Sequence, residues 1–253
     1  MIKETFPTVW QDQLNQLGFA ELTAIQEKIF QPISQGQTVL GISPTGTGKT
    51  LAYLFPSLLK LKPKKAQQLL ILAPNTELAG QIFDVCKAWA EPLGLSCQLL
   101  LSGNSQKRQI ERLKKGPEIL IGTPGRIFEL TKLKKIKMMN VDTIILDEFD
   151  QLLSDSQYAF VDKILHYAPR DHQLIYMSAT AKFDQDKIAE NTLRISIDNQ
   201  TLDNIQHFYM QVEKRDKVEL LRKLSNVEEF RGLVFFNSLS EDRKSTRLNS
   251  SHW

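Results

Sequence analysis

Six short apolar runs alternate along the chain with longer segments in which apolar residues recur at helical spacing. The apolar runs span residues 38–43, 68–74, 97–103, 118–124, 143–148 and 174–180. Nearly continuous apolar character over so few residues is typical of strands buried on both faces of a parallel sheet. Helical spacing is present in residues 50–61, 76–93, 105–115, 125–133 and 157–167. The alternation predicts an α/β fold in which helices cover both faces of a parallel sheet.

The last twelve residues differ in character from the rest of the chain. Residues 242–253 read DRKSTRLNSSHW and resemble the translation of a sequencing-library adapter, so we exclude them from the fold prediction as a non-native tail. A natural polar tail is the alternative. Without the three basic residues and one acidic residue of this tail, the 32 basic and 29 acidic residues of the chain fall to 29 and 28. The overall charge therefore says little about nucleic-acid binding, which only local charged patches could indicate.

The lengths of the apolar runs and the number of cysteines indicate the cellular compartment in which we expect the protein. No run approaches the length of a membrane span, and no signal-like segment opens the chain. The two cysteines, Cys86 and Cys97, form no CxxC pair and have no neighbouring histidine. We expect reduced thiols in a cytoplasmic protein without a membrane partner.

A glycine-rich segment, SPTGTGKT, follows the first apolar run at residues 43–50. Gly46 and Gly48 allow the backbone to approach a phosphate, Lys49 supplies a cation, and Thr50 offers a hydroxyl to Mg²⁺ at the start of a helix. The usual first glycine of this pattern is replaced by Ser43, and a plain turn is the alternative. The predicted phosphate-binding residues are Ser43, Pro44, Thr45, Gly46, Thr47, Gly48, Lys49 and Thr50.

An acidic pair ends the fifth apolar run. Asp147 and Glu148 follow a strand predicted to be buried, where carboxylates are costly unless they bind something. Asp147 is suited to hold Mg²⁺ through water, and Glu148 to act as the general base that polarises an attacking water. Together with Lys49, these residues predict hydrolysis of a nucleoside triphosphate. A solvated helix start is the alternative reading of the pair.

Further segments appear in an order that resembles one helicase family. The acidic segment continues as DEFD at 147–150, and the other segments are GFAELTAIQ at 18–26, PNTELAGQ at 74–81, SGN at 102–104, TPGR at 123–126 and SAT at 178–180. With the glycine-rich segment, they resemble the motifs of the DEAD-box ATP-dependent RNA helicases of superfamily 2. The resemblance covers residues of about 6 to 240 and implies RecA-like domains that use ATP and Mg²⁺ and bind RNA.

The resemblance also implies roles for individual residues. Gln26, assisted by Thr23, would read the adenine, and Phe6 would pack on the adenine ring, with Trp10 as a competing candidate. Residues that would hold the RNA backbone without reading its sequence are Pro74, Gly103, Thr123, Pro124, Gly125 and Arg126. Ser178 and Thr180 would couple hydrolysis to unwinding.

Three departures from the family pattern stand out. Thr76 replaces an arginine that would touch an RNA phosphate, and Asn104 replaces the second glycine of a pair. Both changes predict a weaker grip on RNA, with the remaining affinity more dependent on lysines and on salt. Phe149 replaces the usual alanine of the acidic motif, where we expect a packing role.

The domain prediction follows from the same resemblance. Residues 1–198 would form the first RecA-like domain, 199–204 a linker, and 205–241 the start of an incomplete second RecA-like domain. In that second domain, the sequence predicts strands over 205–212 and 232–238 with a helix over 216–230 between them. No segment resembles the second-domain motifs that supply an arginine finger. We expect the intact parent protein to be an active helicase, but this chain, without that arginine, to have low activity. A non-enzymatic RNA-binding module and a DNA-translocating helicase of the same superfamily are the alternatives.

Overall fold

The computed structural model describes residues 2–197, 209–213 and 216–227. The chain divides into two compact units, residues 1–200 and residues 201–253, and each is considered by itself. Residues 199–204, predicted as a linker, lie outside the described part of the chain, as do residues 242–253.

The first unit is built on one sheet of seven parallel strands, whose order is β3-β4-β2-β5-β6-β1-β7. Their bounds are β1 Val39–Ile42, β2 Leu69–Leu72, β3 Cys97–Leu100, β4 Ile119–Gly122, β5 Thr143–Leu146, β6 Gln173–Ser178 and β7 Leu193–Ser196. Each of the six predicted strands is confirmed. The seventh strand, β7, pairs with β1 at the sheet edge and is mostly exposed.

Helices connect these strands. The α-helices of the first unit are α1 Thr8–Gln16, α2 Ala24–Ser34, α3 Lys49–Leu58, α4 Thr76–Ala90, α5 Gln106–Leu113, α6 Pro124–Lys132, α7 Phe149–Leu152 and α8 Asp155–Tyr167. Four short 3-10 turns lie at Ile2–Thr5, Glu91–Leu93, Met138–Asn140 and Gln185–Lys187. The five predicted helices correspond to α3, α4, α5, α6 and α8.

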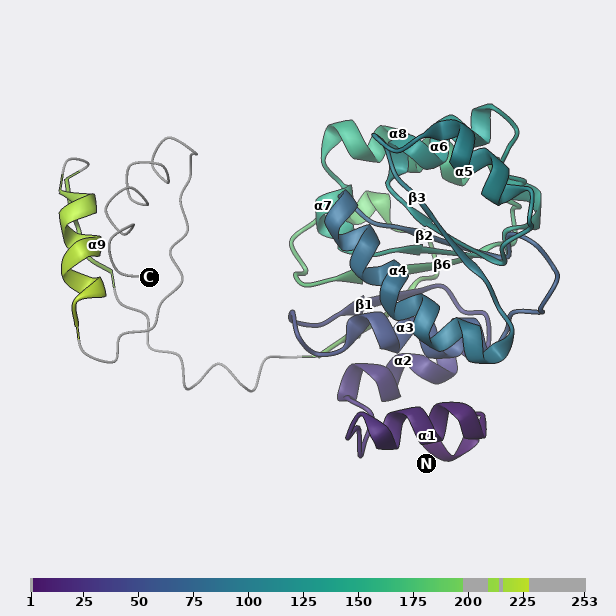
Figure 1. Cartoon of the computed structure of the whole chain (residues 1–253), viewed down its shortest axis with the longest axis horizontal. Helices are drawn as coiled ribbons and strands as arrows, with labels where there is room; N and C mark the ends of the chain where they lie inside the picture. Colours follow the sequence, from purple (N-terminus) through teal and green to yellow (C-terminus); the bar gives the residue numbers. More distant parts are fainter. Residues whose placement is uncertain (1, 198–208, 214–215, 228–253) are drawn as a thin grey trace. The chain divides into compact units, whose positions relative to one another are not determined.

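Strand residues alternate between two hydrophobic clusters because successive side chains of a strand point to opposite faces. In β2, Leu69 and Ile71 pack with α1, α2, α3 and α4, whereas Leu70 and Leu72 belong to the cluster on the other face. That second cluster includes residues of α5, α6, α7 and α8. Figure 1 shows the two layers of helices with the sheet between them. The predicted α/β architecture with helices on both faces is therefore confirmed.

Buried polar side chains tie the amino ends of the strands together. The Gln173 amide donates to the carbonyls of Ile33 and Gln37, and Lys60 donates to the Gln173 side-chain oxygen at 2.7 Å. The Glu118 carboxylate accepts the N–H of Lys64 and both the N–H and hydroxyl of Ser96. This amino edge is thus held by hydrogen bonds from side chains to the loops around it.

The second unit is described only in part. Residues 209–213 form neither helix nor strand, although a strand was predicted over 205–212. Helix α9, Lys217–Ser225, falls within the helix predicted for residues 216–230. The strand predicted at 232–238 lies outside the described residues.

Two further findings concern the compartment predictions. No helix among the residues that the structure describes is long and apolar enough to cross a membrane. Cys86 and Cys97 are free thiols whose sulfur atoms lie 3.8 Å apart between α4 and β3, and Cys86 is buried.

Candidate active site at the carboxyl edge of the sheet

All the predicted site segments except the amino-terminal one follow strands at the carboxyl edge of the sheet. This edge is where open parallel sheets bind their ligands. The phosphate-loop segment follows β1, the acidic pair follows β5 and the SAT segment follows β6. The segments predicted to bind RNA follow β2, β3 and β4. In the strand order, β5, β6 and β1 are neighbours, and β3, β4 and β2 form the adjoining block.

The glycine-rich loop has the backbone that a phosphate cradle needs. Gly46 and Gly48 both have φ of +83°, which is favourable for glycine and strained for other residues. Gly48 is the last residue before α3, so the free N–H groups at the start of that helix face the loop. The hydroxyls of Ser43 and Thr47 lie 2.7 Å apart, and Thr47 donates to the Pro44 carbonyl. Ser43, in place of the usual first glycine, therefore helps to close the loop.

Lys49 lies at the centre of this loop. Its side chain is buried, and Nζ donates to the Ser43 carbonyl at 3.0 Å. Nζ also lies 3.6 Å from Oε1 of Glu148. The loop after β1 and the acidic pair after β5 therefore meet, although β6 lies between those two strands.

Asp147 has both carboxylate oxygens engaged. Oδ2 accepts the Tyr53 hydroxyl at 2.9 Å, and Oδ1 accepts the Glu148 N–H at 2.9 Å. Burial raises the pKa of Asp147 to about 6, against the opposing effect of the Tyr53 hydrogen bond. The pKa of Tyr53 itself is raised well above its ordinary value, chiefly by burial and then by the charge of Asp147, while a hydrogen bond with the Thr50 side chain lowers it.

Glu148 has a left-handed backbone, with φ of +48° and ψ of +54°. A residue other than glycine in this conformation carries strain, and such strain often marks a functional site. The turn ends β5 and starts α7, and it leaves the Glu148 carboxylate mostly buried beside Lys49. Phe149 then enters the core against Tyr176, with ring centroids 4.7 Å apart, which is the packing role expected for it.

Gln26 connects the amino-terminal segment to the phosphate loop. Its side-chain oxygen accepts the Thr23 N–H at 2.9 Å, in a capping box at the start of α2. Its amide nitrogen donates to the Gly48 carbonyl at 3.2 Å. A Cβ on Gly48 would lie 2.5 Å from this nitrogen, so a larger residue would displace the end of the Gln26 side chain as well as strain the backbone at φ +83°. The predicted adenine-reading residues thus lie against the loop predicted to hold the phosphates.

The position of Phe6 does not favour the adenine contact predicted for it. The ring is only 4% exposed and packs against Phe55 and Trp10, with centroids 4.9 and 5.6 Å away. Trp10, the competing candidate, is fully buried and donates its indole N–H to the Trp89 carbonyl. Both rings complete the core beneath α1 and α3, so neither presents a free face to a nucleotide.

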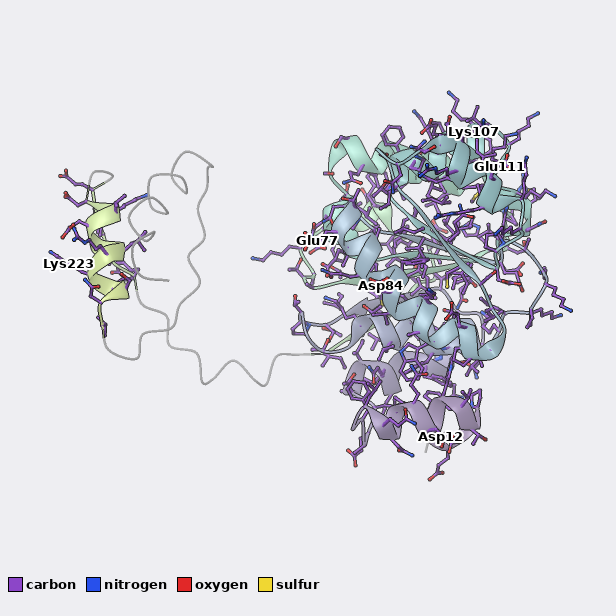
Figure 2. The ribbon with its side chains drawn as sticks, in the orientation of Figure 1. Asp12, Glu77, Asp84, Lys107, Glu111 and Lys223 are labelled. Carbon is purple, nitrogen blue, oxygen red and sulfur yellow. The ribbon has the colours of Figure 1, made fainter. Side chains whose placement is uncertain are left out.

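Among the predicted RNA contacts, Pro74 and Pro124 are buried, Thr123 and Gly125 are half-buried, and Gly103 is exposed. Gln157 of α8 donates to the Pro74 carbonyl at 2.6 Å. Asn75 caps α4 by accepting the Leu78 N–H, which leaves Thr76 exposed in the first turn. Figure 2 shows Glu77, the next residue, at this end of α4. The place of the missing arginine is therefore open to solvent.

Arg126 faces inward in this structure. It is buried, and its guanidinium donates to the carbonyls of Leu101 and Asn104 and to the Glu129 carboxylate. The side chain thereby fastens the loop after β3, which contains Gly103 and Asn104, to the start of α6. The direct phosphate contact predicted for Arg126 would require these bonds to be exchanged.

The SAT segment contacts both neighbouring segments. Ser178 is buried, and its carbonyl accepts the Ser43 N–H of the phosphate loop at 3.1 Å. Its hydroxyl bonds the Thr180 carbonyl and N–H. Thr180 in turn donates to Oδ2 of Asp150 at 3.1 Å. The two predicted coupling residues thus lie between the loop after β1 and the acidic segment after β5.

A model of the family described as DEAD/DEAH box helicase matches residues 23–188, more than half of the chain. The chain belongs to this family. It is 41% identical over 236 residues to the probable ATP-dependent RNA helicase YfmL of Bacillus subtilis. The matched residues cover 90% of this chain and 63% of that relative. It is 37% identical to the DEAD-box ATP-dependent RNA helicase CshC of Bacillus cereus, over 94% of this chain and 62% of that relative.

The fold comparison agrees with the family. A crystal structure of a DEAD box protein from the hyperthermophile Methanococcus jannaschii matches with a TM-score of 0.72 and 25% identity, over 96% of this chain and 68% of that one. This likeness identifies the seven-stranded unit as the RecA-like domain of a DEAD-box protein. The chain spans less than two thirds of the length of the two curated relatives.

The side-chain oxygens at the carboxyl edge suit a hard cation that is also bound by the phosphates of a nucleotide. Within the described residues, no group of three or more His, Cys, Asp or Glu side chains could hold a metal by itself. The Thr50 hydroxyl and the Asp147 carboxylate are oxygen donors of the kind that Mg²⁺ takes, and Mg²⁺ in such sites keeps waters and binds substrate phosphates. The residues present therefore fit a magnesium–nucleotide complex.

Tyr53 is the contact that sequence reasoning missed. It lies one helical turn after Thr50, in an apolar run whose spacing predicts only a buried helix. A buried tyrosine needs a hydrogen-bond partner for its hydroxyl, so a tyrosine in an apolar helix indicates a polar contact with another part of the fold.

Proposed function

We propose that this chain supplies the ATP-binding RecA-like domain of an ATP-dependent RNA helicase. In that protein, RNA-stimulated ATP hydrolysis would be coupled to local separation of RNA duplexes. The observation that carries the proposal is the meeting of Lys49 with Glu148 beside Asp147, which joins a phosphate loop to an acidic pair. Buried charges of opposite sign at a strand edge suit a triphosphate and its cation better than they suit core packing.

Each residue has a definite part in the proposed reaction. The loop from Ser43 to Thr50 would surround the β- and γ-phosphates, and Lys49 would exchange the Ser43 carbonyl and Glu148 for phosphate oxygens. Mg²⁺, when bound, supplies positive charge that offsets the charge developing on the phosphates. Thr50 and Asp147 would hold that cation. Glu148, released from Lys49, would accept a proton from the attacking water.

RNA would bind along the adjoining block of the edge, after β2, β4 and β3. Half-buried and exposed backbone at Thr123, Gly125 and Gly103 offers N–H groups for phosphates. Contacts of this kind carry no base information, so we propose binding that is independent of RNA sequence. The Ser178–Thr180 segment would pass changes between the phosphate loop and the acidic segment after β5, because it contacts both Ser43 and Asp150.

The proposed division of labour follows the chain. Residues 1–198 would bind ATP, residues 199–204 would link, and residues 205–241 would begin a second RecA-like domain. Catalytic residues from a second domain are worth on the order of 10³–10⁵ in turnover, so we expect this chain alone to bind nucleotide and to hydrolyse it slowly. A cytoplasmic location stays a prediction.

The test is ATP turnover by the full-length parent with single-stranded RNA, with single-stranded DNA of the same sequence, and without nucleic acid. We expect strong stimulation by RNA alone. Equal stimulation by DNA would favour a DNA-translocating helicase. RNA binding without any turnover, together with no nucleotide binding by this chain, would favour a non-enzymatic RNA-binding module.

A further inference from the structure

Tyr53 joins its phenol hydroxyl to one of the groups assigned to the cation. The hydroxyl donates to Oδ2 of Asp147 at 2.9 Å, and Tyr53 follows Thr50, the other such group, by about one turn of α3. Tyr53 is fully buried and Asp147 is 3% exposed, so water does not compete for this bond. The link also joins α3, which begins at the phosphate loop, to the turn that follows β5.

The hydrogen bonds of Asp147 restrict how it can meet a cation. One oxygen accepts the Tyr53 hydroxyl and the other accepts the Glu148 N–H, so neither oxygen offers its full set of lone pairs. An ionised carboxylate has no proton to give and only accepts, so the Tyr53 hydroxyl is the donor in this bond. A carboxylate held in this way is poorly placed to grip a metal with both oxygens at once.

We propose that Tyr53 is a positioning residue that holds Asp147 for a single-oxygen or water-mediated contact with the nucleotide-bound cation and so favours Mg²⁺ over Ca²⁺. The proposal rests on the proposed ATP site and deepens it. Mg²⁺ keeps several waters in a strict octahedral arrangement, whereas Ca²⁺ accepts more oxygens and often takes a carboxylate with both oxygens. The Asp147 carboxylate is fixed in orientation, and each of its oxygens already accepts one hydrogen bond, so it suits Mg²⁺ better than Ca²⁺.

The test uses Tyr53→Phe, which removes one hydroxyl and keeps the ring. Tyr176→Phe is the matched control, because Tyr176 is equally buried and its hydroxyl accepts the Ala189 N–H, outside the nucleotide segments. Binding of a fluorescent ATP analogue to the 253-residue chain is followed at increasing MgCl₂, at increasing CaCl₂, and in EDTA. Thermal unfolding of each variant shows whether it is folded.

We expect Tyr53→Phe to raise the MgCl₂ concentration for half-maximal binding by about tenfold, the lower end of what loss of a partner of a metal ligand costs. The preference for MgCl₂ over CaCl₂ should fall, and binding in EDTA should stay unchanged. Tyr176→Phe should match the unsubstituted chain throughout.

Three results would overturn the inference. An unchanged MgCl₂ requirement and ion preference in Tyr53→Phe would show that the hydroxyl does not position Asp147. An equal loss of binding in EDTA would show that it only supports the loop. If Tyr53→Phe fails to fold, the unsubstituted chain decides the matter, since equal binding with CaCl₂ and MgCl₂ would contradict the selectivity. Absence of nucleotide binding under every condition would instead refute the proposed ATP site itself.

Discussion

Lys49 and Glu148 face each other across the carboxyl edge of the sheet, with Nζ 3.6 Å from Oε1, although 98 positions of chain lie between them. Both side chains are mostly buried, at 8% and 18% exposure. A triphosphate entering the loop would compete with Glu148 for the lysine. We therefore expect nucleotide binding to replace the Lys49–Glu148 ion pair with contacts between Lys49 and phosphate oxygens.

Lys49→Ala should weaken nucleotide binding by at least about tenfold, because a buried cation would no longer meet the phosphates. Titration of the 253-residue chain with a fluorescent ATP analogue measures this affinity. Lys60→Ala is the control, since Lys60 is tied to Gln173 at the opposite edge of the sheet. An unchanged affinity in Lys49→Ala would count against the phosphate loop.

Glu148→Gln in the full-length parent should abolish turnover, since an amide cannot accept the proton of the attacking water. ATP-dependent RNA binding should persist, because the neutral side chain leaves the phosphate loop and Asp147 in place. Single-turnover hydrolysis and RNA binding by fluorescence anisotropy separate the two effects. Undiminished hydrolysis would rule out Glu148 as the base.

Thr180→Val should uncouple hydrolysis from strand separation. The change removes the hydroxyl that donates to Asp150, a bond at the protein surface, so the free energy of unfolding should change by less than about 1 kcal/mol. In the parent, we expect ATP turnover to persist while duplex separation per ATP falls. Thr192→Val, which removes a hydroxyl bonded to the Ala189 carbonyl, is the control. A parallel loss of both activities would contradict a coupling role.

Thr76→Arg should strengthen RNA binding. Thr76 is exposed in the first turn of α4, so an arginine there can reach a phosphate without disturbing the core. One added phosphate contact should steepen the dependence of log affinity on log salt concentration by about 0.7 for a single strand. Gln16→Arg adds the same charge on α1, the helix that carries Asp12 in Figure 2, and should have little effect. Equal gains from both variants would indicate general charge attraction.

Glu118→Gln should destabilise the domain without touching the site. Burial raises the pKa of Glu118, but hydrogen bonds from Ser96 and Lys64 outweigh it, and the pKa is lowered overall. A lowered pKa means that the stabilisation is present above the unfolded value near 4.3 and is lost as pH falls through the folded value. We expect a loss of about 1–3 kcal/mol in unfolding free energy at pH 7.

The difference between Glu118→Gln and the unsubstituted chain should begin to shrink as the pH falls below about 4.3, the unfolded value, and should vanish once the pH has fallen through the lowered pKa of the folded carboxyl. Denaturant unfolding at several pH values measures it. Glu111→Gln, which loses only an exposed ion pair with Lys114, should cost less than about 1 kcal/mol. A pH-independent difference would contradict the assigned origin of the stability.

Much of the fold was predictable because parallel strands buried on both faces leave continuous apolar runs, as in Leu69–Leu72. The edge strand β7 carries a weaker signal, since three of its four residues are exposed. The strand order was beyond reach, because periodicity reports burial along an element and not which element lies beside it. Only the register between β1 and β6 brings Ser178 against Ser43.

For the site, the sequence indicated which segments gather at the carboxyl edge but not where each side chain points. Arg126 was expected to face a ligand and instead faces Leu101 and Asn104, because their carbonyls need donors. Phe6 was expected at the nucleotide and lies in the core with Phe55. Tyr53 was passed over because its helix is otherwise apolar. Each of these contacts is made across the fold, and local spacing does not encode it.

The hydrogen-bonded amino edge and the strained turn at the carboxyl edge should give two different kinds of mutational phenotype. Substitutions at Gln173, Lys60 or Glu118 break contacts between elements, so in cells they should lower the abundance of the protein and leave each surviving molecule competent. Replacing Glu148 by glycine relieves a strained backbone residue and removes the carboxylate proposed as the general base, so we expect variant molecules to accumulate normally but to lack turnover. A mutational scan scored for both abundance and activity would therefore sort the two ends of the same seven strands into opposite classes.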